Sequence, residues 1–179
     1  MSTMRIGLAI GLSALLVGSV SASFGQQQST SPLQAVGELI IGRWTGEGVY
    51  AADYPGIGKK DEKFTTTRTC GWVAGKAAIR CEGGDNETTW TRLHWWDAAA
   101  KEIKHVGVDS GGNWDAGTIS KQGTKLVWAS AGSFSDGRKV EYKVETTFED
   151  NGNTFVQTGT TILGGVRNEF RDTYKRVAQ

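Results

Sequence analysis

Residues that build reactive or metal-binding sites are scarce in this chain. Its 179 residues include two histidines and two cysteines. His94 and His105 are separated by ten intervening residues with no HExxH pattern, and there is no second cysteine pair, so no zinc-site pattern is present. A serine nucleophile elbow of the G-x-S-x-G kind is also absent. We therefore predict neither a metal nor a cofactor, and we assign no catalytic residue.

Long apolar runs are confined to the N-terminus. Arg5 precedes an uncharged stretch over residues 6–25, whose apolar centre at 8–17 is too short to cross a bilayer and is followed by small residues. This pattern predicts a signal peptide over 1–25, cleaved after Ala22 or Gly25, and a secreted or periplasmic chain without membrane insertion. A retained anchor helix is the alternative. Residues 26–31 are predicted to be a flexible segment, and 32–179 a single domain.

A surplus of positive charge is missing as well. The whole chain carries 20 lysines and arginines against 19 aspartates and glutamates, and the signal segment removes Arg5 and no acidic residue. The mature chain therefore has no net charge. Because nucleic-acid binders draw most of their affinity from neutralising phosphates, we predict that DNA and RNA are not partners.

Cys70 and Cys81 flank a segment that has the pattern of two strand arms around a turn. If the turn centres between Gly75 and Lys76, the cysteines lie opposite each other at about 5.5 Å between Cα atoms, within disulfide range. If it centres on Ala74 and Gly75, they lie on a diagonal at about 7–8 Å, which is too far. Because an exported protein meets oxidising surroundings, we predict the disulfide, with two half-buried thiols as the alternative.

The rest of the sequence indicates one short helix followed by strands. Residues 32–41 carry apolar side chains at helical spacing, with Ser31 as N-cap and Pro32 at the first helical position. From Ile41 onward, runs rich in Thr, Val, Trp, Tyr and Phe are separated by Gly, Asp and Asn, which predicts about ten strands. They lie near residues 43–52, 63–73, 77–83, 88–96, 102–109, 113–120, 125–130, 139–149, 154–162 and 166–177. Tight turns favour an antiparallel meander, and closure removes the exposed edges, so we predict an all-β, single antiparallel up-and-down β-barrel.

A family resemblance rests on the two ends of this barrel. The first strand opens with Gly42-Arg43-Trp44-Thr45-Gly46-Glu47-Gly48, whose glycines lack a Cβ and let the strand bend sharply, and the last strand ends with Tyr174-Lys175-Arg176-Val177. With the helical lead, this arrangement resembles the calycin superfamily. It is most similar to bacterial secreted lipocalin-like proteins of unknown function, and more distantly to fatty-acid-binding and nitrobindin barrels. The resemblance covers residues 33–177.

The resemblance also implies roles for particular residues. In such barrels a Trp on the first strand plugs one end, and an Arg from the closing strand packs across it. Trp44 matches the Trp, and Arg176 is the better match for the Arg, with Arg171 second. A guanidinium on an indole face is stabilised by cation–π attraction. A nitrobindin-type haem needs a histidine late in the barrel, and none follows His105, so we do not expect haem.

Seven tryptophans are the largest anomaly of the composition. Strand alternation places Trp90, Arg92, His94 and Trp96 on one face, but both faces carry large aromatics, so alternation does not say which face looks inward. Indole surfaces suit flat or apolar ligands. The predicted ligand-binding residues are Arg92, His94, Trp90, Trp96, Trp114 and Trp128. The alternatives are a barrel core filled with indoles and a surface or partly buried His94.

These observations favour an exported lipocalin-like barrel that binds a small apolar or aromatic ligand without catalysis. Two alternatives stay open. The first is a hydrolase or isomerase that uses the barrel interior, with Glu47, His94 or a tyrosine as acid or base. The second is a structural or interaction protein of the cell envelope with a filled barrel. Residues able to do acid or base chemistry show no spacing that forces them together; they are Glu47, Asp109, Asp115, Tyr50, Tyr142 and Tyr174.

Overall fold

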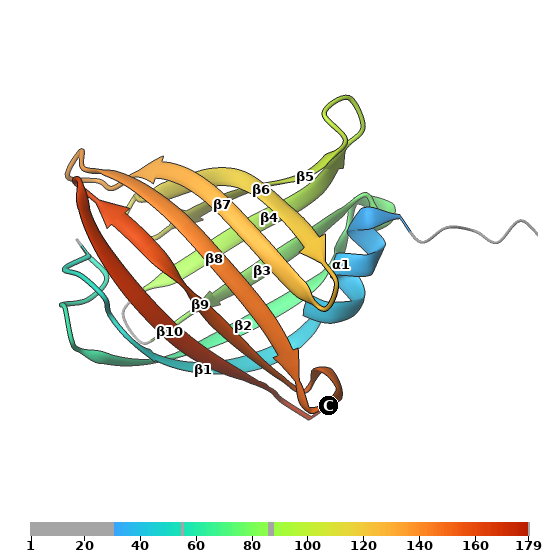
Figure 1. Ribbon diagram of the computed structural model, residues 1–179, viewed down its shortest axis with the longest axis horizontal. Helices are drawn as coiled ribbons and strands as arrows, with labels where there is room; N and C mark the ends of the chain where they lie inside the picture. The colour runs from blue at the N-terminus through green and yellow to red at the C-terminus, as the bar shows by residue number, and fades with distance from the viewer. Residues whose placement is uncertain (1–30, 55, 86–87, 179) are drawn as a thin grey trace, which may run out of the picture.

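The computed structural model describes residues 31–54, 56–85 and 88–178; the predicted signal peptide and residues 26–30 of the predicted flexible segment lie outside these ranges. Within the described ranges the chain forms one α-helix and ten strands, and the strands close into an antiparallel up-and-down barrel (Figure 1). The predicted fold class is confirmed. None of the helices in the described part of the chain is long and apolar enough to span a membrane.

Strand neighbours in the barrel follow chain order, and the last strand returns to pair with the first. The elements are α1 (Pro32–Ile40), β1 (Gly42–Val49), β2 (Lys63–Val73), β3 (Ala78–Gly84), β4 (Thr89–Asp97), β5 (Glu102–Asp109), β6 (Trp114–Gln122), β7 (Lys125–Ser133), β8 (Lys139–Glu149), β9 (Thr154–Leu163) and β10 (Val166–Arg176). β1 ends at Val49, before its predicted end at residue 52. Beyond it the backbone of Tyr50 is hydrogen-bonded to Asp61 and Glu62, and the chain turns into a loop. β7 continues past its predicted end, through Ser133.

Helix α1 covers one end of the barrel (Figure 1). The Gln34 N–H donates to Ser31 Oγ over 3.2 Å, so Ser31 is the N-cap, and Pro32 occupies the first turn, where no N–H is needed. One face of the helix is apolar and packs into the core of the barrel. Its most buried side chains are Leu33, Val36 and Ile40.

The β2–β3 hairpin carries a disulfide. Cys70 and Cys81 are direct cross-strand partners, their Cα atoms are 4.0 Å apart, and the S–S distance is 2.03 Å. The strands resume pairing at Val73 and Ala78, which centres the turn as the first of the two predicted registers requires. The predicted disulfide is therefore confirmed, and both cysteines are buried in the interior.

The interior of the barrel is divided into two halves. In the half next to α1, which we call the closed half, aliphatic side chains pack against the helix; they are Ile79, Ile103, Ile119 and Leu126. At the opposite end, which we call the open end, the loop between β1 and β2 folds over the rim. There Ala52, Tyr54 and Ile57 pack against Phe134. A helix thus covers the closed half, whereas at the open end the loop between β1 and β2 lies over the rim.

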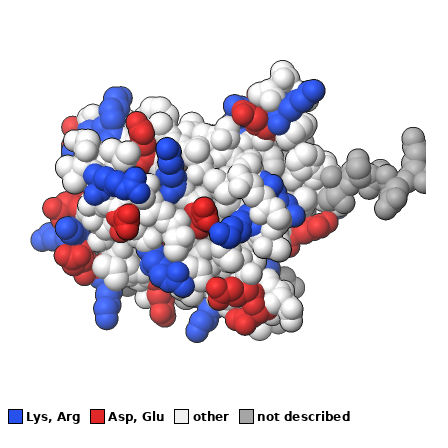
Figure 2. Space-filling model, in the orientation of Figure 1, with Lys and Arg blue, Asp and Glu red and all other residues white. Residues whose placement is uncertain are grey.

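The outer surface carries charges of both signs. Figure 2 shows Lys and Arg interspersed with Asp and Glu over the face in view. Several opposite charges pair across or along strands, as Lys125 of β7 and Glu145 of β8 do over 2.9 Å. Such exposed pairs stabilise the fold by about 0–1 kcal/mol each. The face in view therefore presents mixed charge rather than a field of one sign.

Candidate functional site

A cavity of about 290 Å³ lies inside the barrel, between the middle of the strands and the open end. This volume is at the lower end of the range of about 300–1,000 Å³ that is usual for small-molecule sites. Its aromatic lining consists of Trp90, Trp114, Trp128, Phe134, Tyr142 and Phe170. Its ionisable lining consists of Arg68, Arg92, His105, Asp109, Asp115, Asp172 and Tyr174, together with Tyr142. The cavity therefore combines apolar walls with a small set of inward-pointing polar groups.

The structure shows which face of β4 looks inward. Trp90, Arg92, His94 and Trp96 point into the barrel, and His94 is 0% exposed. Four of the six predicted ligand-binding residues line the cavity, although Trp114 pairs with the exposed Val108, has the strand parity opposite to the inward-facing Asp115 and is 49% exposed. The four are Trp90, Arg92, Trp114 and Trp128. His94 and Trp96 belong to the packed closed half and do not line the cavity.

The two histidines meet inside the barrel. His94 of β4 and His105 of β5 are cross-strand partners with ring centroids 6.0 Å apart, and each ring packs edge-on against Trp128, at 5.4 and 5.7 Å. Within the described residues, no ring nitrogen of either histidine has a hydrogen-bond partner. Burial, followed by the charges of Arg68 and Arg92, holds the pKa of His94 well below its usual value. Burial and Arg92 lower the pKa of His105 to about 4. Both imidazoles are therefore neutral near pH 7.

Arg92 is paired within the cavity wall. Its guanidinium donates to Asp115 Oδ1 over 2.7 Å, and Asp115 Oδ2 lies 3.7 Å from Nδ1 of His105. Burial alone would raise the pKa of Asp115, but Arg92 outweighs it and His105 adds to the effect, so this pKa lies below its usual range. Burial alone would lower the pKa of Arg92, and Asp115 raises it above its usual value instead. The pair is thus ionised and neutral as a unit.

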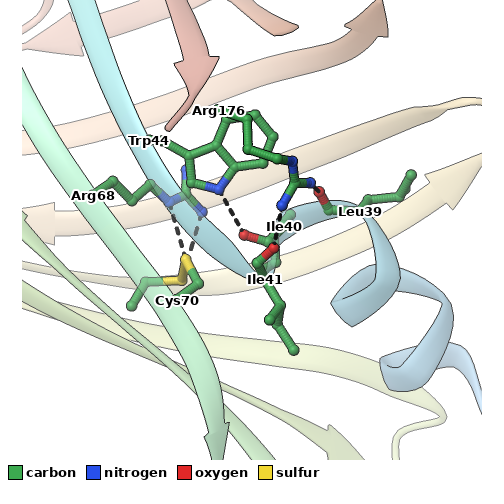
Figure 3. Close-up of a disulfide and its surroundings, with 8 residues drawn as sticks. Leu39, Ile40, Ile41, Trp44, Arg68, Cys70 and Arg176 are labelled. Atoms are coloured by element: carbon green, nitrogen blue, oxygen red, sulfur yellow. Dashed lines mark hydrogen bonds between the residues drawn. A yellow bond between two sulfur atoms is a disulfide. The ribbon is translucent and has the colours of Figure 1, made fainter. Parts of the chain in front are cut away.

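Arg68 of β2 lies deeper and has different partners. It is 7% exposed, its Nε donates to Cys70 Sγ over 3.2 Å, and its Nη2 lies 3.7 Å from Cys81 Sγ (Figure 3). Its guanidinium also lies 5.5 Å from the centre of the Phe155 ring. Sulfur is a weak acceptor, so these contacts place the guanidinium without neutralising it. Burial lowers the pKa of Arg68 to about 10, which leaves it charged at neutral pH.

Asp172 of β10 is another ionisable group in the cavity wall. Its Oδ1 is buried and has no hydrogen-bond partner within the described part of the chain. Burial raises the pKa of Asp172 to about 7, so a large fraction of this carboxyl group is protonated at neutral pH. Burial also raises the pKa of the neighbouring Tyr174 to about 12, which keeps its hydroxyl protonated.

The closed half contains a stopper formed by Trp44 and Arg176, which are cross-strand partners on β1 and β10. The guanidinium carbon of Arg176 lies 4.1 Å from the centre of the Trp44 ring, and the indole N–H donates to the Ile40 carbonyl over 2.9 Å (Figure 3). Arg176 also donates to the backbone carbonyls of Leu39, Ile41 and Gly152. Arg171, the second candidate for this role, is exposed on the outer face instead.

The candidates for acid or base chemistry are brought together only in part. Glu47 is exposed on the outer face of β1, and Asp109 accepts hydrogen bonds from the backbone N–H groups of Gly111 and Asn113 in the β5–β6 turn. Asp109, Tyr142 and Tyr174 line the cavity with Asp115, and the Tyr50 ring is tilted against Phe64 with 4.8 Å between the ring centroids. The structure does not bring Glu47 and His94 together.

Arg68, Asp172 and His105 were not among the predicted site residues, although each lines the cavity. A signal for the first two was present in the alternation of their strands. Arg68 has the parity of Cys70, and Asp172 has the parity of Tyr174. Once the cysteines are placed in the interior, alternation also places Arg68 there.

No protein-family profile matches this chain, and no curated protein matches it either. The class of protein is therefore defined by the fold. A closed, antiparallel up-and-down barrel with a helix at one end fits a calycin-like fold.

Proposed function

We propose that this chain is an exported, lipocalin-like barrel that binds a small, largely apolar or aromatic ligand in its interior. The observation that carries the proposal is the cavity of about 290 Å³, because aromatic side chains form much of its wall while the other half of the barrel is densely packed. Interiors of small proteins are normally filled to crystal-like density, so a cavity of this size beside a filled core indicates a binding site. The disulfide supports export, because disulfides persist in oxidising compartments.

The polar groups of the cavity support binding rather than a filled structural barrel. Burying ionisable groups costs stability unless they are paired or hydrogen-bonded, and Asp172 Oδ1 has no hydrogen-bond partner among the described residues. Arg68, Arg92 and Asp115 face the same cavity as Trp90 and Trp128. A few polar groups among apolar walls are typical of sites that orient a small molecule.

The test is native mass spectrometry of protein purified from its own compartment, compared with a variant whose cavity is filled. Val144 of β8 lines the cavity, and Val144→Phe adds a ring inside it. Ala129 of β7 is exposed on the outer face, so Ala129→Phe is the matched control. We expect a co-purifying mass on the wild type and on Ala129→Phe, and its loss from Val144→Phe. A mass retained by Val144→Phe, or no ligand on any of the three, would contradict the proposal.

A further inference from the structure

Asp172 differs from the other carboxyl groups that line the cavity in having no partner for a buried oxygen. Its Oδ1 is buried and has no hydrogen-bond partner among the described residues. The other two carboxyl groups of the lining are occupied. Asp115 is bound to Arg92 over 2.7 Å, and Asp109 accepts hydrogen bonds from the backbone of the β5–β6 turn. A buried carboxylate without such partners is the stronger base, because nothing nearby stabilises its charge.

The surroundings of this carboxyl group are apolar. Gly48 of β1 has no Cβ, and Asp172 Oδ1 occupies the space that a Cβ would fill, next to the ring of Phe64. Phe170 lies two residues before Asp172 on the same face of β10, and both residues line the cavity. Burial raises the pKa of Asp172 to about 7, so both of its protonation states are populated near neutral pH. A general base is most effective when its pKa lies near the working pH.

Donors for a developing negative charge lie on the same wall. Tyr174 shares the inward face of β10 with Asp172, and its ring stacks on Phe155 with 4.5 Å between the centroids. The Arg68 guanidinium lies 5.5 Å from the centre of the same Phe155 ring. Among the described residues, the hydrogen-bond acceptors found for Arg68 are the two disulfide sulfurs, which are weak acceptors. The wall therefore combines a base with a cation and a hydroxyl group that can stabilise an oxyanion.

We propose that Asp172 is a general base, and that the cavity catalyses the transfer of a proton between two carbons of a small, neutral β,γ-unsaturated carbonyl compound. Asp172 takes a proton from the carbon between the carbonyl group and the double bond. The electron pair of that C–H bond delocalises onto the carbonyl oxygen, where Arg68 and Tyr174 stabilise the negative charge. The Asp172 carboxyl group then returns the proton to the far carbon of the former double bond. The double bond becomes conjugated, and no co-reactant is consumed.

This inference goes beyond the proposed function, which requires binding alone, and it rests on the cavity admitting a ligand. Its pH dependence separates Asp172 from two other candidate bases. Burial and Arg92 lower the pKa of His105 to about 4, and Arg92 holds the pKa of Asp115 below its usual range. The titratable and charged groups that face the cavity with Asp172 are Arg68, Arg92, His105, Asp109, Asp115, Tyr142 and Tyr174, with Tyr54 in the loop between β1 and β2.

The test uses two neutral probes on the disulfide-bonded mature chain. Cyclohex-3-en-1-one reports the isomerisation through the absorbance of its conjugated product. 5-Nitrobenzisoxazole reports base strength, because removal of its C3 proton forms a nitrile, breaks the N–O bond and releases a coloured phenolate. We expect the wild type to transform at least one probe faster than buffer, at a rate that rises with pH about a midpoint near 7.

Variants on the inner and outer faces of β10 identify the base. Asp172→Asn keeps the size of the side chain and should lower the rate at pH 8 by about 100-fold or more. Glu169→Gln makes the same change on the exposed outer face and should match the wild type. Arg68→Met should lower kcat for cyclohex-3-en-1-one by about 100-fold, because it removes a donor to the enolate oxygen.

The outcomes separate this inference from the proposed function. If a probe binds but neither is transformed faster than in buffer, the catalytic assignment is wrong while the cavity remains a ligand site. If Asp172→Asn keeps the wild-type rate, Asp172 is not the base. If neither probe binds or reacts, the catalytic assignment fails, and if native mass spectrometry also finds no ligand, the proposed function fails with it. Should Asp172→Asn not fold, the wild-type pH profile decides, because a midpoint near 4 would overturn the assignment to Asp172.

Discussion

The two halves of the barrel interior bury polar groups in different ways. In the closed half, the indole N–H of Trp44 and the guanidinium of Arg176 donate to backbone carbonyls, so the stopper is satisfied by the chain itself. At the cavity, Arg68 has sulfur contacts and Asp172 has a carboxylate oxygen without a partner among the described residues. The closed half is built for stability. The half that contains the cavity keeps polar groups whose burial costs free energy, and this cost is offset only when a ligand binds them.

The stopper should therefore give the largest loss of stability. Trp44 is 1% exposed and stacks edge-on with Phe155 at 4.7 Å. Trp44→Ala removes this ring and leaves a void, so we expect the free energy of unfolding in urea to fall by about 3–5 kcal/mol. Trp114→Ala at the rim of the cavity removes the same side chain from an exposed position and should cost under about 0.5 kcal/mol. If Trp44→Ala and Trp114→Ala lowered the free energy of unfolding equally, the two halves would not differ in the way described.

Asp172 should make stability depend on pH, in the direction opposite to an ordinary paired carboxylate. The folded chain holds the Asp172 proton up to about pH 7, whereas the unfolded chain releases it at about pH 4. The folded state therefore binds more protons in this window, and the free energy of unfolding falls as the pH rises through it. Asp172→Asn cannot ionise, so this pH-dependent loss of stability is absent from the variant. The free energy of unfolding of the variant should therefore match that of the wild type at pH 4 and exceed it by at most about 4 kcal/mol at pH 8.

Urea titrations of both proteins from pH 4 to pH 8 measure this difference. The histidines titrate in both proteins, so subtracting the two curves isolates Asp172. The ionisable side chains that share its cavity are Arg68, Arg92, His105, Asp109, Asp115, Tyr142 and Tyr174; Tyr54 faces it from the loop between β1 and β2. Glu47→Gln on the exposed outer face is the control and should give a small, constant difference. A constant difference for Asp172→Asn as well would contradict a raised pKa.

The disulfide should have an intermediate effect. Cys70 and Cys81 are 11 residues apart, and closing a loop of this size restricts the unfolded chain enough to stabilise the fold by about 2–3 kcal/mol. The double variant Cys70→Ala/Cys81→Ala should lower the urea midpoint accordingly. A dithiol reductant should lower the midpoint of the wild type but leave that of the variant unchanged. A wild-type midpoint that is insensitive to reduction would count against a stabilising role.

The smallest effect is expected from Arg176→Lys. Lysine keeps the charge over the Trp44 ring but cannot reach three separate carbonyls with one ammonium group, so we expect a loss of about 1–2 kcal/mol. Arg171→Lys, on the exposed face of the same strand, should be neutral within about 0.5 kcal/mol. Thermal melts of both variants measure the difference, and a neutral Arg176→Lys would show that charge alone holds the indole.

The fold could be predicted from sequence because its signals are local and repeat along the chain. Period-two runs ending in turn residues predicted the strands, and Ser31 with Pro32 predicted the start of α1. The orientation of β4 could not be predicted, since Trp95 on one face and Trp96 on the other are equally large. Turning that face inward required the packing of β3 and β5 on either side.

The site was predicted only in part, because the cavity depends on how all the strands pack together and cannot be predicted from the sequence pattern of any one strand. Alternation explains why Trp90 and Trp128 were found, but it does not show that the barrel is filled near His94 and hollow near Arg92. Arg68 was missed because it stands alone in a threonine-rich strand, where a single charge is typical of an outer face. Its place follows from the disulfide two residues later.

The seam between β1 and β10 joins two segments that lie far apart in the sequence. Arg176 donates to the carbonyl of Ile41, 135 residues earlier, and the direct pairing of the two strands covers the short stretch from Trp44 to Glu47. Because pairing over such a separation requires a costly loop closure, the growing sheet keeps both edges unpaired until β10 is available. A chain that stalls before Tyr174 would present those edges to other molecules, so aggregation before completion is the hazard built into this topology.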